Sequence, residues 1–295
     1  MMQPKQHIES IRFKSHQKNL LMTIIFSLFI CACGNTGMQP TASITSPTVV
    51  LEKNTIVTPT IEVTEIPKDV YIPITTEPWA YIDKRYCDYG ATLFYDSWNE
   101  TWRENGFSIV YGERQLSEVP LEKYALLILF EPNPEQEDFS KEDIEAINNY
   151  VEKGGQLFLL VNSSEREGFT GDYSGPDKAN KVASNFGVEF DNKMLNPYDN
   201  DGWTGFVQKY HPITRNIVSW HLGNGPCSIK IISNDADDLL RNRDGDILMA
   251  VSSKGYGRAL FLADGYELGY AAQYLGDDTL FTDIVKWFNP KNIDS

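Results

Sequence analysis

From about residue 79 onward, apolar and polar positions alternate in blocks of strand and helix length. Ala125–Phe130 is an almost unbroken apolar run, which is typical of a strand covered on both faces. Ser140 is expected to begin a helix, with Asp143 as its partner in a capping box, and Gly154–Gly155 are expected to end it. Gln156–Val161 is a second apolar run. The pattern therefore predicts a strand–helix–strand unit, in which a crossover helix joins parallel strands.

The rest of this region has the same two periodicities. Asp244-Gly245 between apolar flanks predicts a β-hairpin, whereas residues 191–210 have no period and are expected to be irregular. The sequence thus predicts an α/β fold, a three-layer sandwich with a mainly parallel, flavodoxin-like central sheet and a late β-hairpin. The other predicted elements are strands at 79–83, 107–111, 188–190, 228–232, 247–251 and 259–263, and helices at 90–105, 179–186 and 279–288.

The N-terminal residues 1–33 have the pattern of an export signal. Lys14 and Lys18 precede the apolar run Leu20–Ala32, which is too short to span a bilayer and has the length of a signal-peptide core. The run ends in Ile-Cys-Ala-Cys, which resembles the lipobox of bacterial lipoproteins. Cys33 is the expected lipid attachment site, because Cys31 would follow a bulky isoleucine. An ordinary signal peptide and an uncleaved anchor are the alternatives.

Residues 34–78 are rich in Thr, Pro and β-branched side chains, which favour extended backbone and block helices. We interpret them as a tether between the anchor and a folded domain at 79–290. The expected location is the extracytoplasmic side of a bacterial cell membrane.

The charge of the chain narrows the choice of partners. The formal net charge is −15, and residues 1–33 carry four basic side chains against one acidic, so the remainder carries −18. Such an acidic protein lacks the basic footprint that nucleic acids require. It is also unsuited to electrostatic adhesion to anionic lipids, so a lipid anchor is the expected link to the membrane. A protein partner in the envelope and a small polar ligand remain as expected partners.

Metal and cofactor signals are weak. Of the cysteines beyond the export signal, Cys87 and Cys227 form no C-x-x-C pair, so a zinc site is not expected; a disulfide and two free thiols both remain open. Asp199 and Asp201 resemble a fragment of a calcium loop, as does the run 234–238, but both lack the glutamate of a full loop, and we expect solvated acidic loops. Gly255-Tyr256-Gly257 is expected to be a tight turn, and no phosphate-binding loop is present, so no cofactor is expected.

Four features stand in one order: LLILFEP with its helix and GGQLFLLVN, then ANKVASNFGVEF, HPITRNI and GYGRALFLADG. Together they resemble the class I glutamine amidotransferase-like domains, which have a flavodoxin-like fold. The nearest resemblance is to the bacterial group around the gliding-motility GldG proteins and to the related domain of intraflagellar transport proteins. It covers about residues 79–289.

In the enzymes of this family a cysteine nucleophile lies on a G-x-C-x-G turn after a central strand. The matching stretch here is Val161-Asn162-Ser163-Ser164-Glu165, which has neither the cysteine nor the glycines. The resemblance therefore implies a non-catalytic binding or assembly module of an envelope or transport complex. The alternative is a hydrolase or amidotransferase with Ser163 as nucleophile and His211 as base. His211 opens HPIT, which also fits a structural turn.

Ligands of open α/β sheets bind at the carboxyl ends of the parallel strands. Those ends are expected to present a polar, acidic group without a lysine or arginine, suited to a polyol, a sugar or a cation. Trp203 and Trp220 would serve a sugar-binding receptor if they were exposed. The expected ligand-binding residues are Asp83, Glu131, Asn133, Asn162, Ser163 and Asp264.

Overall fold

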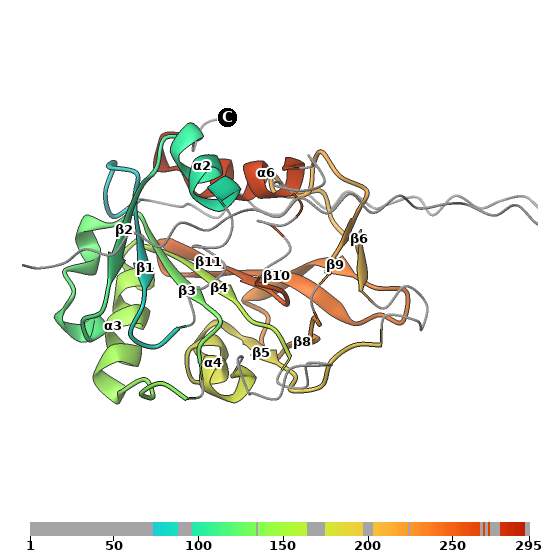
Figure 1. Cartoon of the computed structure of the whole chain (residues 1–295), viewed down its shortest axis with the longest axis horizontal. Helices are drawn as coiled ribbons and strands as arrows, with labels where there is room; N and C mark the ends of the chain where they lie inside the picture. Colours follow the sequence, from blue (N-terminus) through green and yellow to red (C-terminus); the bar gives the residue numbers. More distant parts are fainter. Residues whose placement is uncertain are drawn as a thin grey trace, which may run out of the picture. The chain divides into compact units, whose positions relative to one another are not determined.

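The computed structural model describes residues 73–87, 96–133, 135–163, 175–196, 203–223, 225–265, 268, 271 and 278–292. In this part of the chain a mixed sheet lies between two layers of helices (Figure 1). The predicted α/β fold is confirmed.

One half of the sheet is parallel, in the order β2-β1-β3-β4-β11. The strand–helix–strand unit predicted from the sequence forms its centre, because Leu126 of β3 pairs with Ala80 of β1 on one side and with Gln156 of β4 on the other. The bounds are β1 (Trp79–Asp83), β2 (Ser108–Gly112), β3 (Leu126–Phe130), β4 (Gln156–Leu160) and β11 (Gly257–Leu262).

The other half is antiparallel and extends further than the single hairpin that the sequence predicted. From β11 it continues through β10, β9 and β6 to β7, while β8 pairs with both β10 and β5. The bounds are β5 (Val188–Phe190), β6 (Thr204–Val207), β7 (Ser219–His221), β8 (Ile229–Ile231), β9 (Ala236–Arg241) and β10 (Ile247–Lys254).

Two expectations for this half were wrong. The region 191–210 contains the strand β6. Its Gly205 resembles a turn residue in the sequence, but it allows β6 to lie close to β9, because a Cβ there would be 2.9 Å from Cβ of Leu240. The acidic run 234–238 is not a solvated loop, because Asp237 and Asp238 lie in β9. Asp238 pairs with Arg241, three residues further along β9. Asp237 pairs with Lys209, which is twenty-eight residues away and therefore gives no local signal.

Helices cover both faces of the parallel strands. Helices α2 (Asp96–Glu104) and α6 (Thr279–Phe288) lie over one face, and α3 (Lys141–Glu152) and α4 (Pro176–Ala183) lie over the other (Figure 1). Single-turn 3₁₀ helices complete the described elements: η1 (Leu116–Glu118), η2 (Leu121–Lys123), η3 (Ser184–Phe186) and η5 (Pro290–Asn292).

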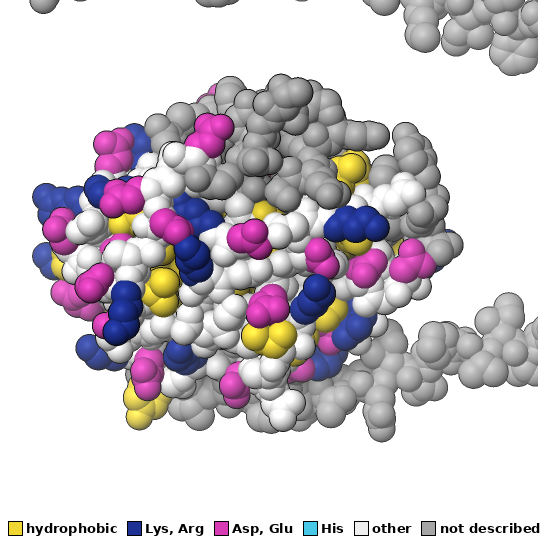
Figure 2. Space-filling model, turned by 90° about the horizontal axis from the view of Figure 1, so that it is seen from below, with side chains coloured by type: hydrophobic (Ala, Val, Ile, Leu, Met, Phe, Trp, Pro, Cys, Tyr) yellow, Lys and Arg dark blue, Asp and Glu magenta, His cyan; other side chains and the backbone are white. Residues whose placement is uncertain are grey.

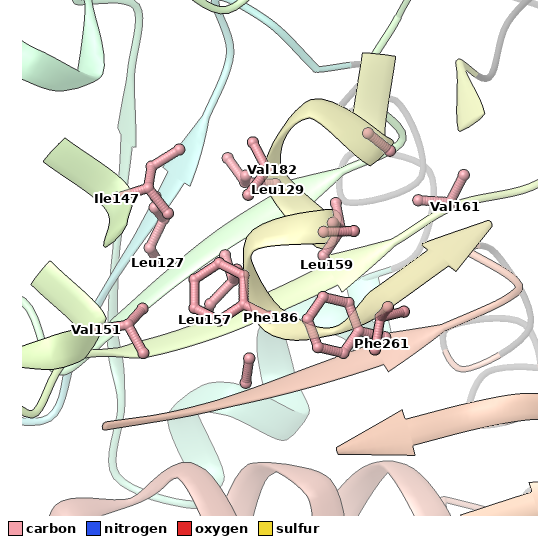
Figure 3. Close-up of a cluster of buried hydrophobic side chains, with 14 of the residues drawn as sticks. Leu127, Leu129, Ile147, Val151, Leu157, Leu159, Val161, Val182, Phe186 and Phe261 are labelled. Carbon is pink, nitrogen blue, oxygen red and sulfur yellow. The ribbon is translucent and has the colours of Figure 1, made fainter. Parts of the chain in front are cut away.

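Each layer has its own apolar core. On the face covered by α2 and α6, Trp98 of α2 stacks on Phe281 of α6 with ring centroids 4.7 Å apart. On the opposite face, Ile147 and Val151 of α3 pack against the side chains of β3 and β4 (Figure 3). The capping box predicted for α3 is present, because Ser140 and Asp143 each accept a hydrogen bond from the backbone N–H of the other.

The outer surface on the side of α3 and α4 carries interspersed acidic and basic side chains (Figure 2). Lys181 pairs with Asp138 there, and Lys141 pairs with Glu145 along α3. The negative charge of the chain is therefore not gathered into a field of one sign on the described part of this face.

The folded body begins before the predicted boundary at residue 79. Ile74 packs against the core, and its N–H donates to the carbonyl of Gly154, 3.1 Å away. None of the helices in the described residues is long and apolar enough to cross a membrane. The export signal, Cys33 and nearly all of the predicted tether lie outside the described residues.

Candidate functional site

The carboxyl ends of β3, β4 and β11 lie side by side because Phe130, Leu160 and Leu262 are register partners. The alignment continues past the strands. The N–H of Glu131 donates to Leu160 O at 2.8 Å, and the N–H of Val161 donates to Leu262 O at 3.0 Å. The polar residues that follow each strand are thereby held at one edge of the sheet, as the sequence predicts.

Three of the six predicted ligand residues meet around Gly265. The amide oxygen of Asn162 accepts the N–H of Gly265 at 2.7 Å. A Cβ on Gly265 would lie 2.6 Å from Oε1 of Glu131, so this carboxylate lies against the glycine backbone. Asp264 precedes the glycine. We call Glu131, Asn162 and Asp264 the central rim group; all three are at most 1% exposed.

Glu131 has an unusual backbone conformation. Its φ is +49°, and among the described residues it is the only non-glycine with positive φ. Such a conformation costs on the order of 1 kcal/mol or more and persists only where surrounding contacts enforce it. Here the bond from its N–H to Leu160 and the contact with Gly265 hold it. A strained residue at the end of a central strand is the kind of outlier that points to a functional site.

Asp83 and Asn133 belong to a second group, organised by a lysine that the sequence did not single out. Lys178 of α4 is 6% exposed, and its Nζ donates to the carbonyls of Tyr86 at 2.9 Å, Asn133 at 2.8 Å and Glu137 at 2.6 Å. Oδ2 of Asp83 accepts the N–H of Tyr86 at 2.7 Å. One lysine on an amphipathic helix gives no sequence signal for such a role.

The hydrogen bonds of Asp83 and Asn133 are made with residues outside the central rim group. The side-chain oxygen of Asn133 accepts the N–H of Glu135 at 2.8 Å, and thus stabilises its own loop. Asp83 is fully buried beside Cys87, and burial raises the pKa of its carboxyl to about 6, although the N–H of Tyr86 opposes the shift. The side chain of Cys87 and the backbone N–H of Arg85 also form hydrogen bonds with this carboxyl and likewise oppose the shift.

No protein-family model matches the chain, and no curated protein matches it. Among solved structures it is similar to the mmIFT52 N-terminal domain, with 14% identity and a TM-score of 0.54 over 71% of this chain and 96% of that one. It is also similar to a cytoplasmic protein from Salmonella typhimurium LT2, with 15% identity and a TM-score of 0.52 over 72% and 99%. A ThuA-like protein from Bacteroides uniformis has 15% identity and a TM-score of 0.46 over 72% and 92%. These likenesses concern the fold alone, which is similar to that of glutamine amidotransferase-like, flavodoxin-like domains.

The family resemblance of the sequence would place a catalytic cysteine in the stretch after β4. Here Ser163 is 2% exposed, and its N–H donates to the carbonyl of Gly225 at 3.1 Å. Asn162 forms a β-bridge with Pro226. The stretch is therefore held as an extension of β4 against residues 225–226.

His211 lies near the first residue of β4, at the end of the strand opposite to Ser163. Its ring packs against Trp287, with centroids 5.4 Å apart, and Arg258 stacks on Trp287 at 4.1 Å. Arg258 Nε donates to the side chain of Gln156, the first residue of β4, at 2.8 Å. Ser163 lies three residues beyond Leu160, the last residue of β4, and the five residues of the strand alone rise about 17 Å. The structure does not bring Ser163 and His211 together.

The surroundings of His211 match the structural turn that HPIT also allowed. Its Nδ1 accepts the N–H of Ile213 at 3.2 Å, and the hydroxyl of Thr214 donates to the carbonyl of Lys209 at 3.1 Å. Burial, with a smaller contribution from Arg258, lowers the pKa of His211 to about 4. The imidazole is therefore neutral over most of the physiological range.

The two cysteines of the folded body are free thiols rather than a disulfide. Cys87 lies beside Asp83, and Cys227 Sγ lies 3.6 Å from the carbonyl oxygen of Val161. Both are fully buried, and burial raises the pKa of each thiol well above its usual value. Since the thiolate is the reactive form, neither is a ready nucleophile.

The remaining candidates divide between buried and undescribed positions. Trp220 is buried and therefore belongs to the core rather than to an exposed binding platform. Trp203 is half-buried, and its indole N–H donates to the carbonyl of Leu195 at 2.6 Å. Asp199 and Asp201 lie outside the described residues. Within those residues, no three His, Cys, Asp or Glu side chains are placed to hold a metal ion.

Proposed function

We propose that this protein is a lipid-anchored extracytoplasmic lipoprotein whose amidotransferase-like domain is a non-catalytic binding or assembly module. The N-terminal sequence up to Cys33 supports the anchor. The separation of Ser163 from His211, and the buried thiols with raised pKa, support a domain without acyl-transfer chemistry.

The domain binds a neutral polyhydroxy ligand, such as a sugar or polyol, at the central rim group. The observation that carries this proposal is the convergence of Glu131, Asn162 and Asp264 on Gly265 at the carboxyl edge. Carboxylate and amide oxygens accept hydrogen bonds from hydroxyls, and two carboxylates without a lysine or arginine in the group disfavour a phosphate or carboxylate ligand.

The partner of such a module is an envelope or transport protein, by analogy with the GldG-type group that the sequence resembles. That analogy rests on the order of the motifs in the sequence.

Thermal unfolding of the mature full-length protein tests the ligand class. We expect at least one neutral sugar or polyol to raise Tm, because saturation at 100 times Kd contributes about 2.7 kcal/mol. Sugar phosphates serve as the charged comparison and should not stabilise it, because the carboxylates of the rim repel them. Asp264→Asn should abolish the shift, whereas Asp237→Asn, which removes an ion pair in β9, should retain it. A panel without any stabilising neutral compound, or an Asp264→Asn variant that folds and still responds, would overturn the assignment.

Metabolic labelling with an alkyne fatty acid tests the anchor separately. Cys33→Ser should lose both the label and membrane sedimentation, whereas Cys31→Ser should keep both. Label retained in Cys33→Ser would contradict the anchor without bearing on the rim.

A further inference from the structure

The first described residues lie at the edge of the sheet where the parallel strands begin, which we call the amino edge. The N–H of Ile74 donates to the carbonyl of Gly154, two residues before β4 begins, and Trp79 is the first residue of β1. Because β3 lies between β1 and β4, residues 74–79 run along this edge. The chain from the N-terminus therefore reaches the folded body at the amino edge, and the central rim group lies at the opposite, carboxyl edge.

The exposed Trp, Tyr and Phe side chains of the described residues all lie at the amino edge. Trp79 is 45% exposed at the start of β1, and Tyr256 is 57% exposed in the turn between β10 and β11. Tyr210 is 62% exposed. It follows Lys209, which pairs with Asp237 near the start of β9, and β9 begins beside the end of β10. Three aromatic side chains from distant parts of the chain thus meet solvent at one edge of the sheet.

The exposed charges at the helix ends near these aromatic side chains are balanced. Helices α2, η2 and α3 end at the amino edge, and each end carries one exposed acidic and one exposed basic side chain next to each other: Arg103-Glu104, Glu122-Lys123 and Glu152-Lys153. The net charge of −18 that remains after the export signal is therefore not concentrated at these helix ends. Such a surface suits a zwitterionic partner, with the aromatic side chains rather than the charges making the contact.

Trp and Tyr favour the headgroup region of a bilayer, because one end of each side chain is apolar and the other forms hydrogen bonds. Pro73 is forty residues beyond Cys33, and a proline-rich chain of that length reaches about 120 Å when extended. A lipid on Cys33 thus keeps the amino edge within reach of the bilayer surface. Because a tether makes the second contact intramolecular, weak aromatic contacts are enough to orient the domain.

We propose that the amino edge contacts the bilayer that holds the lipid anchor, with Trp79, Tyr210 and Tyr256 in the headgroup region. This inference rests on the anchor of the proposed function but not on the ligand at the rim. The five residues of β4 rise about 17 Å from the amino edge to the carboxyl edge. The carboxyl edge, with the central rim group, therefore faces away from the membrane, toward soluble ligands and partner proteins.

Fluorescence of a dye on an introduced cysteine tests this contact in the mature, acylated full-length protein bound to phosphatidylcholine vesicles. Tyr256→Cys and Tyr210→Cys place the environment-sensitive dye NBD at the amino edge, and Asp244→Cys places it on the exposed β9–β10 turn at the opposite edge. Wild-type protein corrects for background, because Cys87 and Cys227 are fully buried. Emission at positions 256 and 210 should rise about twofold on vesicles and be quenched by nitroxide-labelled lipid, because the dye leaves water for the headgroup region. Emission at position 244 should change in neither way.

Vesicle-bound protein whose dye at positions 256 and 210 does not respond, or responds no more than at position 244, overturns the inference and leaves the anchor in place. A rise in emission without quenching by the nitroxide lipid means that a second copy of the protein covers the amino edge, and also overturns it. Absence of the alkyne fatty acid from the wild-type protein overturns the anchor and this inference with it, so the two failures are distinguished. If one tyrosine variant does not fold, the other decides alone.

Discussion

Ser163 and His211 lie at opposite ends of β4, although they are the nucleophile and base that an enzymatic interpretation requires. Ser163 extends the carboxyl end of the strand, where its N–H is bonded to Gly225. His211 packs on Trp287 near Gln156, where the strand begins. A base must lie within about 3 Å of the proton it takes, directly or through one water.

This separation predicts that Ser163→Ala leaves any hydrolase activity of the purified protein unchanged. Turnover of ester and amide substrates by the wild type, Ser163→Ala and His211→Asn is the measurement. A catalytic pair would instead behave as a unit: each single variant would lose about 10²-fold or more, and the double variant would lose no more than either. That pattern would contradict the non-catalytic proposal.

His211 predicts a loss of stability in acid. Its folded pKa is lowered to about 4 from 6.5, so the unfolded chain binds the proton more strongly. The contribution is present above pH 6.5 and is lost as pH falls toward 4, by roughly 3 kcal/mol at most.

The variant that tests this is His211→Asn, because asparagine can still accept the N–H of Ile213 but does not titrate. Urea unfolding at pH 7 and pH 4 should show a smaller acid loss in the variant than in the wild type. Equal losses would mean that other groups cause the acid sensitivity.

The buried thiols predict slow chemical modification. In the native mature protein Cys87 and Cys227 should not react with a thiol reagent at pH 8 faster than the protein unfolds, because each is fully buried with a raised pKa. In denaturant without reductant both should be labelled, as measured by peptide mass spectrometry. Labelling that required a reductant would reveal a disulfide instead.

The turn between β10 and β11 predicts a local packing requirement. A Cβ on Gly257 would lie 2.0 Å from the carbonyl oxygen of Val151 and 2.3 Å from that of Gly155, both backbone atoms that cannot turn aside. Gly257→Ala should therefore lower the free energy of unfolding by about 3 kcal/mol.

Gly245→Ala is the matched control for this turn. Its Cβ would meet nothing within 4 Å, and only its φ of +91° makes alanine unfavourable, at about 1 kcal/mol. Chemical denaturation of both variants should give the larger loss for Gly257. Equal losses would show that the turn can move away from α3.

Sequence reasoning succeeded where the determinants are close together in the chain. The β3–α3–β4 unit follows from two apolar runs, the Ser140–Asp143 cap and a pair of glycines, all within about forty residues. It failed at β6 and β9, where pairing with distant strands decided the structure. The Asp237 carboxylate was taken for a loop residue because its partner Lys209 is twenty-eight residues away.

By itself, the sequence determined the layered α/β fold and placed polar residues after the parallel strands, because strand length, helix period and caps are local properties. Only the tertiary structure separated those residues into two groups. Glu131, Asn162 and Asp264 lie around Gly265. Asp83 and Asn133 lie in the loops that Lys178 contacts. It alone placed His211 away from Ser163. These contacts join residues as far as 103 positions apart, so they depend on strand register and on which helix covers which face.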